Sequence, residues 1–307
     1  MKKEEYQRVA GELEKKLNEF SHHVDRLHGI QPYENLQCFV DQLIDSIRRI
    51  QYVDLIRSRP QHAIRNDPTS DIFDPLRAAS YLSSKGEFEE ACWVTFLATH
   101  AGKNIRTGWT LAAELYGRDR PTGAWTWSQV KANPQAYSTW AARAHTDFVG
   151  QFGNHRKYES VKATGNGPGA VVGSYVAWVT AAGSHKALFA NALAGGATPR
   201  QAFGRLYREM ARVHRFGRTG RFDYLTMLAK LGLAAIDADA TYMRNATGPL
   251  RGARLLFSGQ IDAQLSATEL EARLVVLEAH LNTGMQVLED SLCNWQKSPG
   301  RYEYFGG

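Results

Sequence analysis

The chain has 307 residues, of which 43% are hydrophobic and 22% are charged, and its formal net charge is +6. This length and apolar content are enough to bury the core of one large domain or of two. The moderate basic excess favours an anionic partner, with nucleic acid the leading class, and no uncharged run approaches the roughly 18 residues that a membrane span needs.

The remaining composition predicts a protein without metal or cofactor. The three cysteines are far apart and form neither a disulfide framework nor a metal-binding pattern, and the ten histidines show no HxxxH or HxH spacing. The amino terminus MKKEEYQ leads into charged residues rather than the apolar core of a secretion signal. We therefore expect reduced thiols and a cytoplasmic location.

The first 60 residues carry two helical patterns. Apolar residues recur every three or four positions from Tyr6 to Leu27, and again from Leu36 to Ile56. This spacing predicts two amphipathic helices, broken near Pro32, that form an N-terminal helical hairpin over residues 1–60. The hairpin either packs on the main body or pairs with a second copy in a homodimer, and the sequence leaves both open.

Residues 61–307 are predicted to be a helical domain. Asp74-Pro75 has the pattern of a capped helix start, residues 88–100 predict a buried helix, and residues 266–297 predict one long helix with leucines on its core face. Alternating patterns of strand length are scarce. The predicted fold class is therefore all-α.

The stretch from Ala202 to Leu233 carries the densest chemical signal. Four arginines recur at spacings of three and four, which places them on one face of a helix: Arg205, Arg208, Arg212 and Arg215. Gly217 and Gly220 are predicted to interrupt the helix, and Asp223 follows between Phe222 and Tyr224. Planar cations suit phosphates, and a carboxylate between aromatic rings suits chemistry on a stacked base. Solvated arginines, a helix cap and ordinary core aromatics remain the alternative.

Two further segments carry candidate site residues. In FGNHRKYES, three consecutive residues with cationic character suit a loop or helix start that faces an anion: His155, Arg156 and Lys157. The end of the last predicted helix presents acids, an indole and an amine that either form a site wall or pair with the arginines: Glu289, Asp290, Trp295 and Lys297.

Several long motifs in the same order carry a resemblance to a known family. They are FDPLRAASYLSSKGEFEEACWVTFLATHAGK, FGNHRKYES, HRFGRTGRFDYLTMLAKLGL, ATGPLRGARLLF and GMQVLEDSLCNWQKSP. Together they resemble the third clade of the alpha-glutamyl/putrescinyl thymine pyrophosphorylase family, from about Phe73 to the carboxyl terminus.

The resemblance implies a fold and an activity. Members of the family are similar in proposed fold to the helix-hairpin-helix DNA glycosylases. Phage members elaborate modified thymines in DNA, whereas a bacterial antiviral member of this clade is a DNA glycosylase that removes glucosylated hydroxymethylcytosine from phage genomes, and this chain resembles that member more closely. We therefore expect an antiphage glycosylase acting on modified double-stranded phage DNA, with residues 61–307 as its catalytic domain.

Hydrolysis of an N-glycosidic bond requires a carboxylate near C1′, cations on the phosphates and side chains around the everted base. Asp223 is the first candidate for the carboxylate, followed by Glu289 and Asp290. The DNA-binding candidates are His155, Arg156, Lys157, Arg215, Arg218, Arg221 and Lys297. The base-pocket candidates are Phe222, Tyr224, Trp295 and His100.

Three alternatives differ in chemistry. A Schiff-base lyase using Lys297 or Lys230 is disfavoured, because neither lysine lies in an apolar stretch that would lower its pKa, and we expect a monofunctional enzyme. A transferase would replace an exocyclic substituent of a hypermodified pyrimidine and leave the glycosidic bond intact. A protein that only binds DNA would show a steep salt dependence and alter no base.

Overall fold

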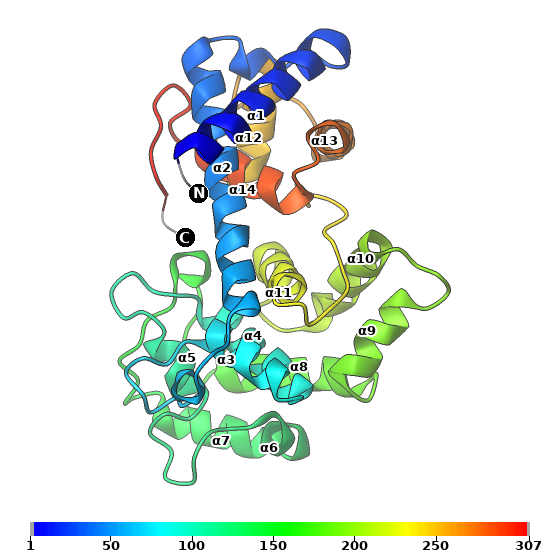
Figure 1. The fold of residues 1–307 in the computed structure, drawn as a ribbon. Coiled ribbons are helices and arrows are strands. Elements are labelled where there is room, and N and C mark those ends of the chain that lie inside the picture. Colours follow the sequence, from blue (N-terminus) through cyan, green and yellow to red (C-terminus); the bar gives the residue numbers. More distant parts are fainter. Residues whose placement is uncertain (1–2, 306–307) are drawn as a thin grey trace. The chain divides into compact units, whose positions relative to one another are not determined.

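A computed structural model describes residues 3–305 of the chain (Figure 1). All regular structure in this range is helical, which confirms the predicted all-α class. The described residues divide into two compact units. Unit 1 comprises residues 3–52 and 238–305, and unit 2 comprises residues 53–237.

Unit 1 contains residues from both the amino-terminal and the carboxyl-terminal part of the chain. Its helices are α1 (Lys3–His23), η1 (His28–Ile30), the first part of α2 (Tyr33–Ser58), α12 (Gly248–Ser258), α13 (Ala267–Leu281) and α14 (Met285–Trp295). The predicted apolar stripe of α1 is covered within the chain, because Phe20 is fully buried against His280 and the Lys16 ammonium donates to the Leu281 carbonyl at 3.0 Å. The predicted homodimer through these helices stays a prediction.

The predicted single helix over residues 266–297 is wrong in one respect. It is two helices, α13 and α14, separated by a turn in which Asn282 has φ 56° and Gly284 has φ 93°. Asparagine and glycine are the residues that adopt this left-handed backbone at the end of a helix with least strain. The leucine periodicity continues through the turn and conceals it in the sequence.

Unit 2 contains the remaining helices. They are the end of α2, η2 (Ala63–Arg65), α3 (Pro75–Ser84), α4 (Phe88–Ala101), α5 (Thr110–Leu115), α6 (Trp127–Ala132), α7 (Pro134–Ala144), η3 (Asn154–Arg156), α8 (Pro168–Thr180), α9 (His185–Leu193), α10 (Pro199–Glu209), η4 (Met210–Arg212) and α11 (Arg218–Lys230). As predicted, Asp74 caps α3, because its carboxylate accepts from the Leu76 and Arg77 amides at 3.1 and 3.2 Å.

Helix α4 forms the centre of the unit 2 core. It is buried along most of its length, which confirms the prediction for residues 88–100. Its Phe96 ring stacks on Tyr175 of α8 with centroids 3.6 Å apart, and Tyr224 of α11 meets Phe96 edge-on at 5.8 Å. Aromatic contacts therefore fix α8 and α11 against α4, and α11 is the helix that carries the first candidate carboxylate.

The predicted domains, 1–60 and 61–307, stay a prediction. Helix α2 contains the boundary between the two units, which falls between Tyr52 and Val53. Residues 238–305 belong to unit 1 with the amino-terminal helices, so the compact units are not continuous along the chain. The helix-hairpin-helix class within the all-α fold also stays a prediction.

Candidate active site

Asp223 lies in the second turn of α11. The helix has Gly217 as its N-cap residue and begins at Arg218. The Asp223 side chain is 34% exposed, and its Oδ2 lies 3.5 Å from Nδ1 of His155, which is 58% exposed. A partly exposed carboxylate beside an accessible imidazole is an arrangement suited to proton transfer with a bound ligand. Unit 2 thus brings together two of the predicted site residues, Asp223 and His155.

His155 lies in the short helix η3, and the next residue, Arg156, holds this helix in place. Arg156 is 5% exposed, and its guanidinium donates from Nε to the His100 carbonyl and from Nη2 to the Arg215 carbonyl, both at 3.2 Å. Gly220 gives this group room, because a Cβ there would lie 2.5 Å from the Arg156 Nη1. Gly220 is inside α11 and does not interrupt it, contrary to the prediction.

The internal position of Arg156 differs from the phosphate-binding role predicted for it. Burial lowers the pKa of Arg156, while the nearby carboxylates of Glu159 and Asp223 oppose that shift. Arg156 therefore links η3, the end of α4 and the segment that precedes α11.

The predicted stripe of four arginines is broken in the structure. Helix α10 ends at Glu209, a 3-10 turn follows, and Arg215 has φ 60° outside any helix. Arg205 donates to the Ala192 and Ala194 carbonyls at 3.1 and 2.9 Å, and Arg215 donates to the Glu159 carboxylate at 2.8 Å. Tertiary partners, which spacing does not reveal, direct these two guanidinium groups to separate places.

The predicted base-pocket residues of unit 2 are core residues in this structure. Phe222 and Tyr224 are 2% and 0% exposed, and the Tyr224 hydroxyl lies 2.7 Å from that of Tyr175. His100 is 1% exposed, and burial, with the guanidinium groups of Arg156 and Arg215, lowers its pKa well below the ordinary value. A buried ring has no face for a stacked base, which is the physical reason for the difference from the prediction.

Four of the predicted site residues belong to unit 1. Glu289, Asp290 and Trp295 lie on α14, and Lys297 follows its end. Asp290 pairs with Arg49, Trp295 is 1% exposed and donates to the Asn35 and Pro299 carbonyls at 3.2 Å, and the Lys297 ammonium donates to Asn294 Oδ1 at 2.8 Å. Asp223 and the two α14 acids thus belong to different units.

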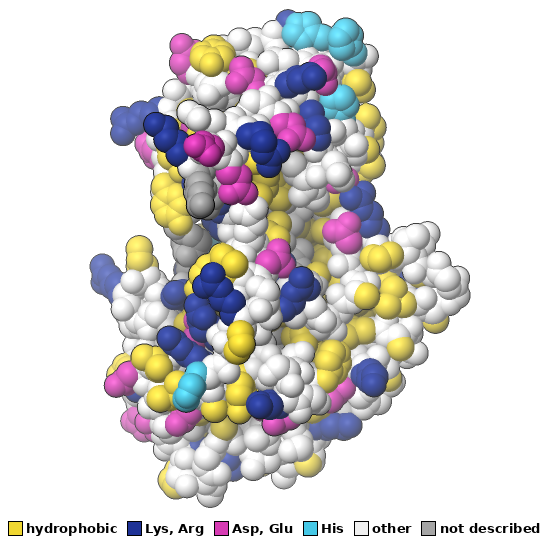
Figure 2. All heavy atoms as spheres, in the orientation of Figure 1, with side chains coloured by type: hydrophobic (Ala, Val, Ile, Leu, Met, Phe, Trp, Pro, Cys, Tyr) yellow, Lys and Arg dark blue, Asp and Glu magenta, His cyan; other side chains and the backbone are white. Residues whose placement is uncertain are grey.

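Cationic side chains lie in the first turns of α11 and next to His155 in the chain. Lys157 is exposed, and its ammonium lies 5.2 Å from the centroid of the exposed Tyr158 ring. Arg218 and Arg221 are half-buried in the first turns of α11, and Arg221 donates to the Tyr207 carbonyl at 3.1 Å. Figure 2 shows exposed Lys and Arg side chains among apolar ones on the face of unit 2 in that view. These positions suit a polyanion.

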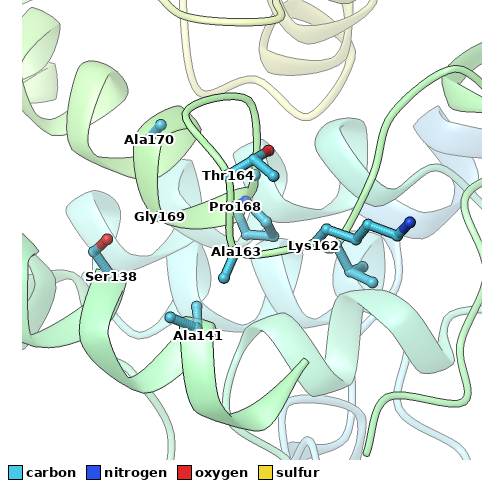
Figure 3. Close-up of a pocket in the computed structure, with 11 residues that line it drawn as sticks. Ser138, Ala141, Lys162, Ala163, Thr164, Pro168, Gly169 and Ala170 are labelled. Atoms are coloured by element: carbon cyan, nitrogen blue, oxygen red, sulfur yellow. The ribbon is translucent and has the colours of Figure 1, made fainter. Parts of the chain in front are cut away.

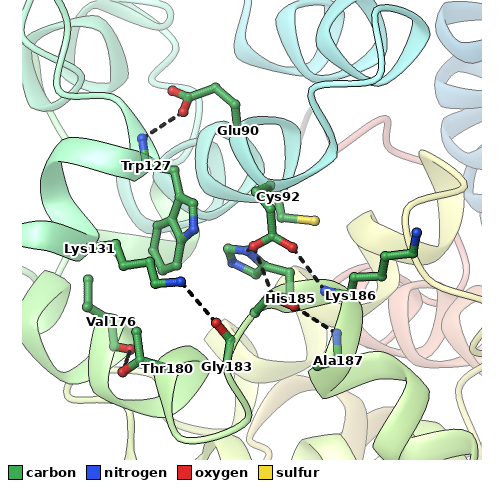
Figure 4. A network of polar contacts seen from close by, with 12 residues as sticks. Glu90, Cys92, Trp127, Lys131, Val176, Thr180, Gly183, His185, Lys186 and Ala187 are labelled. Carbon is green, nitrogen blue, oxygen red and sulfur yellow. Dashed lines mark hydrogen bonds and ion pairs between the residues drawn. The ribbon is translucent and has the colours of Figure 1, made fainter.

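A polar network, not predicted from the sequence, lies in the same unit, and its Glu89 side chain is 32% exposed while its other side chains are buried. Glu89 of α4 accepts from His185 Nδ1 at 2.7 Å and from the His185 and Lys186 amides at 3.0 and 3.1 Å. His185 Nε2 lies 2.6 Å from the Tyr175 hydroxyl, which continues to Tyr224. Figure 4 shows His185 beside Trp127, and their ring centroids are 4.5 Å apart.

The charges of this network follow from its hydrogen bonds. Burial opposes ionisation of Glu89, but the three donated hydrogen bonds outweigh it and lower the Glu89 pKa to about 2. Burial lowers the pKa of His185 and raises that of Tyr175 well above its ordinary value. The network thus holds an ionised carboxylate that accepts three hydrogen bonds. Its one sequence signal was an acid at the start of a strongly apolar helix.

Two pockets of unit 2 have linings without any predicted site residue. The pocket in Figure 3, of about 130 Å³, lies between α7 and the start of α8, where the labelled residues include Ser138, Lys162 and Thr164. A second pocket, of about 310 Å³, is lined by residues of the 70–74 and 103–118 segments, among them Lys103 and Trp109. Neither contains Asp223.

The described residues show neither a metal-binding cluster nor a membrane-spanning helix. They contain no group of three or more His, Cys, Asp or Glu side chains arranged to hold a metal ion. No helix in residues 3–305 combines the length and apolar character required to cross a bilayer.

Comparison with known proteins gives one finding. A family model described as alpha-glutamyl/putrescinyl thymine pyrophosphorylase clade 3 matches residues 34–307. No curated protein and no solved structure matched the chain. The matched range begins at the start of α2 and includes all of unit 2, with His155 and Asp223.

Proposed function

Because the chain belongs to clade 3 of the alpha-glutamyl/putrescinyl thymine pyrophosphorylase family, we propose that it acts on modified bases in DNA. The specific proposal is a monofunctional DNA glycosylase of antiphage defence that excises glucosylated hydroxymethylcytosine from double-stranded phage DNA and leaves abasic sites. The proposal includes a helix-hairpin-helix fold and a cytoplasmic location.

The observation that carries the proposal is the pair formed by Asp223 and His155. A glycosylase requires a carboxylate that is ionised, held in place and accessible. Asp223 is fixed on a helix packed in the core, is one-third exposed, and lies beside an imidazole at 3.5 Å and a buried guanidinium. Of the three candidate carboxylates, Asp223 is the one flanked by the predicted phosphate-binding segment 155–157.

The proposed reaction breaks the bond between C1′ of the deoxyribose and N1 of the base. The bonding electron pair leaves with the base, and positive charge develops at C1′, which the Asp223 carboxylate stabilises. Water then bonds to C1′ through its oxygen and gives one proton to Asp223. That proton passes on to the departing base, so the products are a neutral base and an abasic site.

The cations near α11 supply the binding energy for the DNA in this proposal. Lys157 and Arg221 contact phosphates beside the everted nucleotide, and Arg218 belongs to the same surface. Arg156 does not contact DNA, because its guanidinium is enclosed by protein. Its role is to hold η3, and therefore His155, against α11.

The test uses phage DNA with and without glucosylated hydroxymethylcytosine. The wild-type protein releases the free modified base and forms abasic sites in the modified DNA alone, and Asp223→Asn forms none. Asp147→Asn, which removes an exposed carboxylate elsewhere in unit 2, is the matched control and keeps full activity. Undiminished release of base by Asp223→Asn would exclude this carboxylate from the reaction.

The family description favours one second function. A pyrophosphorylase-type transferase would displace a pyrophosphate substituent from a modified pyrimidine with an amine, using the same surface to evert the base. Mass spectrometry of the nucleosides separates the two functions. A free base supports the glycosylase, whereas an intact nucleoside of changed mass supports the transferase.

A further inference from the structure

We infer that Ile105 is the wedge that enters the DNA base stack when the target nucleotide is everted, an inference that rests on the proposed action on duplex DNA. Ile105 lies in the loop between α4 and α5 and is 99% exposed. Two other exposed isoleucines of unit 2, Ile64 and Ile72, are 43% and 46% exposed, so each rests half of its surface on the protein. Ile105 has almost no such contact.

The loop that presents Ile105 is rigid. Asn104 and Gly108 exchange two backbone hydrogen bonds, at 3.0 and 2.9 Å, which close a tight turn over residues 105–107. Asn104 Oδ1 also accepts from the Arg106 and Thr107 amides at 2.8 and 3.1 Å. Gly108 has φ 57°, a conformation that glycine adopts without steric cost. An apolar side chain held at the tip of a fixed turn loses little entropy when it inserts.

The same loop is attached to the segment that carries the candidate catalytic pair. Asn104 Nδ2 donates to the Phe152 carbonyl at 2.9 Å, and the Gly153 amide donates to the Ala101 carbonyl at 2.8 Å. The two backbones touch, because a Cβ on Gly153 would lie 2.9 Å from the carbonyl carbon of Gly102. Gly153 immediately precedes η3, which holds His155 beside Asp223. Wedge and catalytic pair therefore share one rigid support.

The charges around Ile105 select DNA as its partner. Lys103 and Arg106 are exposed on either side of it in the turn. Apolar wedges that unstack a base step are flanked by cations that hold the neighbouring phosphates, and eversion of a base leaves a gap that such a side chain fills. A protein-binding patch would instead require several contiguous apolar side chains.

The experiment separates the wedge from the chemistry. In an Asp223→Asn background, a duplex with 2-aminopurine next to glucosylated hydroxymethylcytosine reports unstacking by a rise in fluorescence. Ile105→Ala reduces that rise at least about fivefold, Ile105→Leu restores it, and Ile64→Ala, the matched control, equals the parent. In the otherwise wild-type protein, Ile105→Ala lowers the ratio of excision from duplex to excision from single strands about tenfold.

Two results would overturn the inference. One is that Ile105→Ala unstacks the duplex as well as its parent does. The other is that the parent protein does not bind the duplex, in which case the exposed Ile105 would contact a protein partner instead of DNA. Failure of the proposed glycosylase is seen separately, as absence of excision by the wild-type protein from duplex and single strand alike, while the fluorescence still reports on the wedge.

Discussion

Unit 2 contains two pairs of an imidazole and a carboxylate, His155 with Asp223 and His185 with Glu89. In the first pair the nitrogen and oxygen are 3.5 Å apart and the imidazole is 58% exposed. In the second the separation is 2.7 Å, the imidazole is fully buried, and two backbone amides also donate to the carboxylate. The two carboxylates are almost equally exposed, 34% for Asp223 and 32% for Glu89, so the pairs differ in the exposure of the imidazole and in the backbone hydrogen bonds that Glu89 accepts.

This difference assigns each pair a role. A carboxylate that already accepts three hydrogen bonds has little capacity left for a substrate, so the Glu89 pair stabilises the fold by joining α4 to the start of α9. Asp223 lies beside an exposed imidazole, so a ligand can reach the His155 side of this pair. Composition alone does not separate the two pairs, and experiments that treat them in parallel test the assignment.

The largest effect is expected for Asp223→Asn. Loss of the carboxylate removes the group that stabilises charge at C1′ in the proposed reaction, so the excision rate falls about 10²–10⁴-fold. The midpoint of thermal unfolding stays within about 2 °C of wild type, because a partly exposed substitution of equal size costs little stability. Single-turnover kinetics and calorimetry measure both quantities. A large loss of stability with unchanged excision would assign Asp223 to the fold.

For Glu89→Gln we expect a loss of stability instead of a loss of excision. The neutral amide leaves the amides at the start of α9 without their anion, so the free energy of unfolding decreases by about 1–3 kcal/mol. Urea denaturation measures the change. Glu87→Gln, an exposed acid at the start of α4 whose side chain makes no cap hydrogen bond, is the matched control and changes stability little.

Acid should destabilise the second pair. The folded pKa of Glu89, about 2, lies below its ordinary value of 4.5, so its contribution is complete above pH 4.5 and is lost as the pH falls toward 2. His185 also has a lowered pKa, so the unfolded chain binds a proton below about pH 6.5 before the folded chain does. Stability measured against pH should therefore decrease below 6.5, and Glu89→Gln should remove the part below 4.5.

The substitution His155→Gln tests what His155 does in the first pair. If His155 orients Asp223 without transferring a proton in the slow step, excision falls about tenfold, less than for loss of a proton-transfer group. His145→Gln is the control. Loss as large as that of Asp223→Asn would make His155 a direct participant.

The smallest effect is expected for Lys157→Ala. One phosphate contact is lost, so duplex binding weakens uniformly across sequences and the slope of log K against log salt becomes shallower by about 0.9. Fluorescence anisotropy at several salt concentrations measures it. Lys85→Ala, an exposed lysine at the end of α3, should leave the slope unchanged, and an equal change in both variants would remove Lys157 from the interface.

Local patterns predicted much of the fold. Helices α1 and α2 follow from apolar spacing, α4 follows from its strongly apolar content, and the start of α3 follows from Asp74-Pro75, because these signals act within a few residues. The turn between α13 and α14 was missed, since Asn282 and Gly284 interrupt the backbone while the leucine spacing continues. The grouping of residues 238–305 with the amino-terminal helices has no local signal.

The candidate site, like the fold, has features that the sequence predicted and features that it did not. The motif around His155 and the motif around Asp223 were recognised separately in the sequence, and the structure adds their pairing at 3.5 Å. The sequence did not distinguish Arg156, which is buried, from Lys157 beside it, which is exposed. Consecutive side chains point in different directions, and only the packing of neighbouring segments decides which of them meets solvent.

The sequence by itself determined the helical class, the family and the residue types available for chemistry on DNA. Only the tertiary structure decided which of those residues are accessible. Burial enclosed Phe222, Tyr224 and His100 in the core, and a buried guanidinium at Arg156 fixed the segment that holds His155 against α11. Periodicity and motifs depend on neighbours along the chain, whereas accessibility and charge depend on neighbours in space.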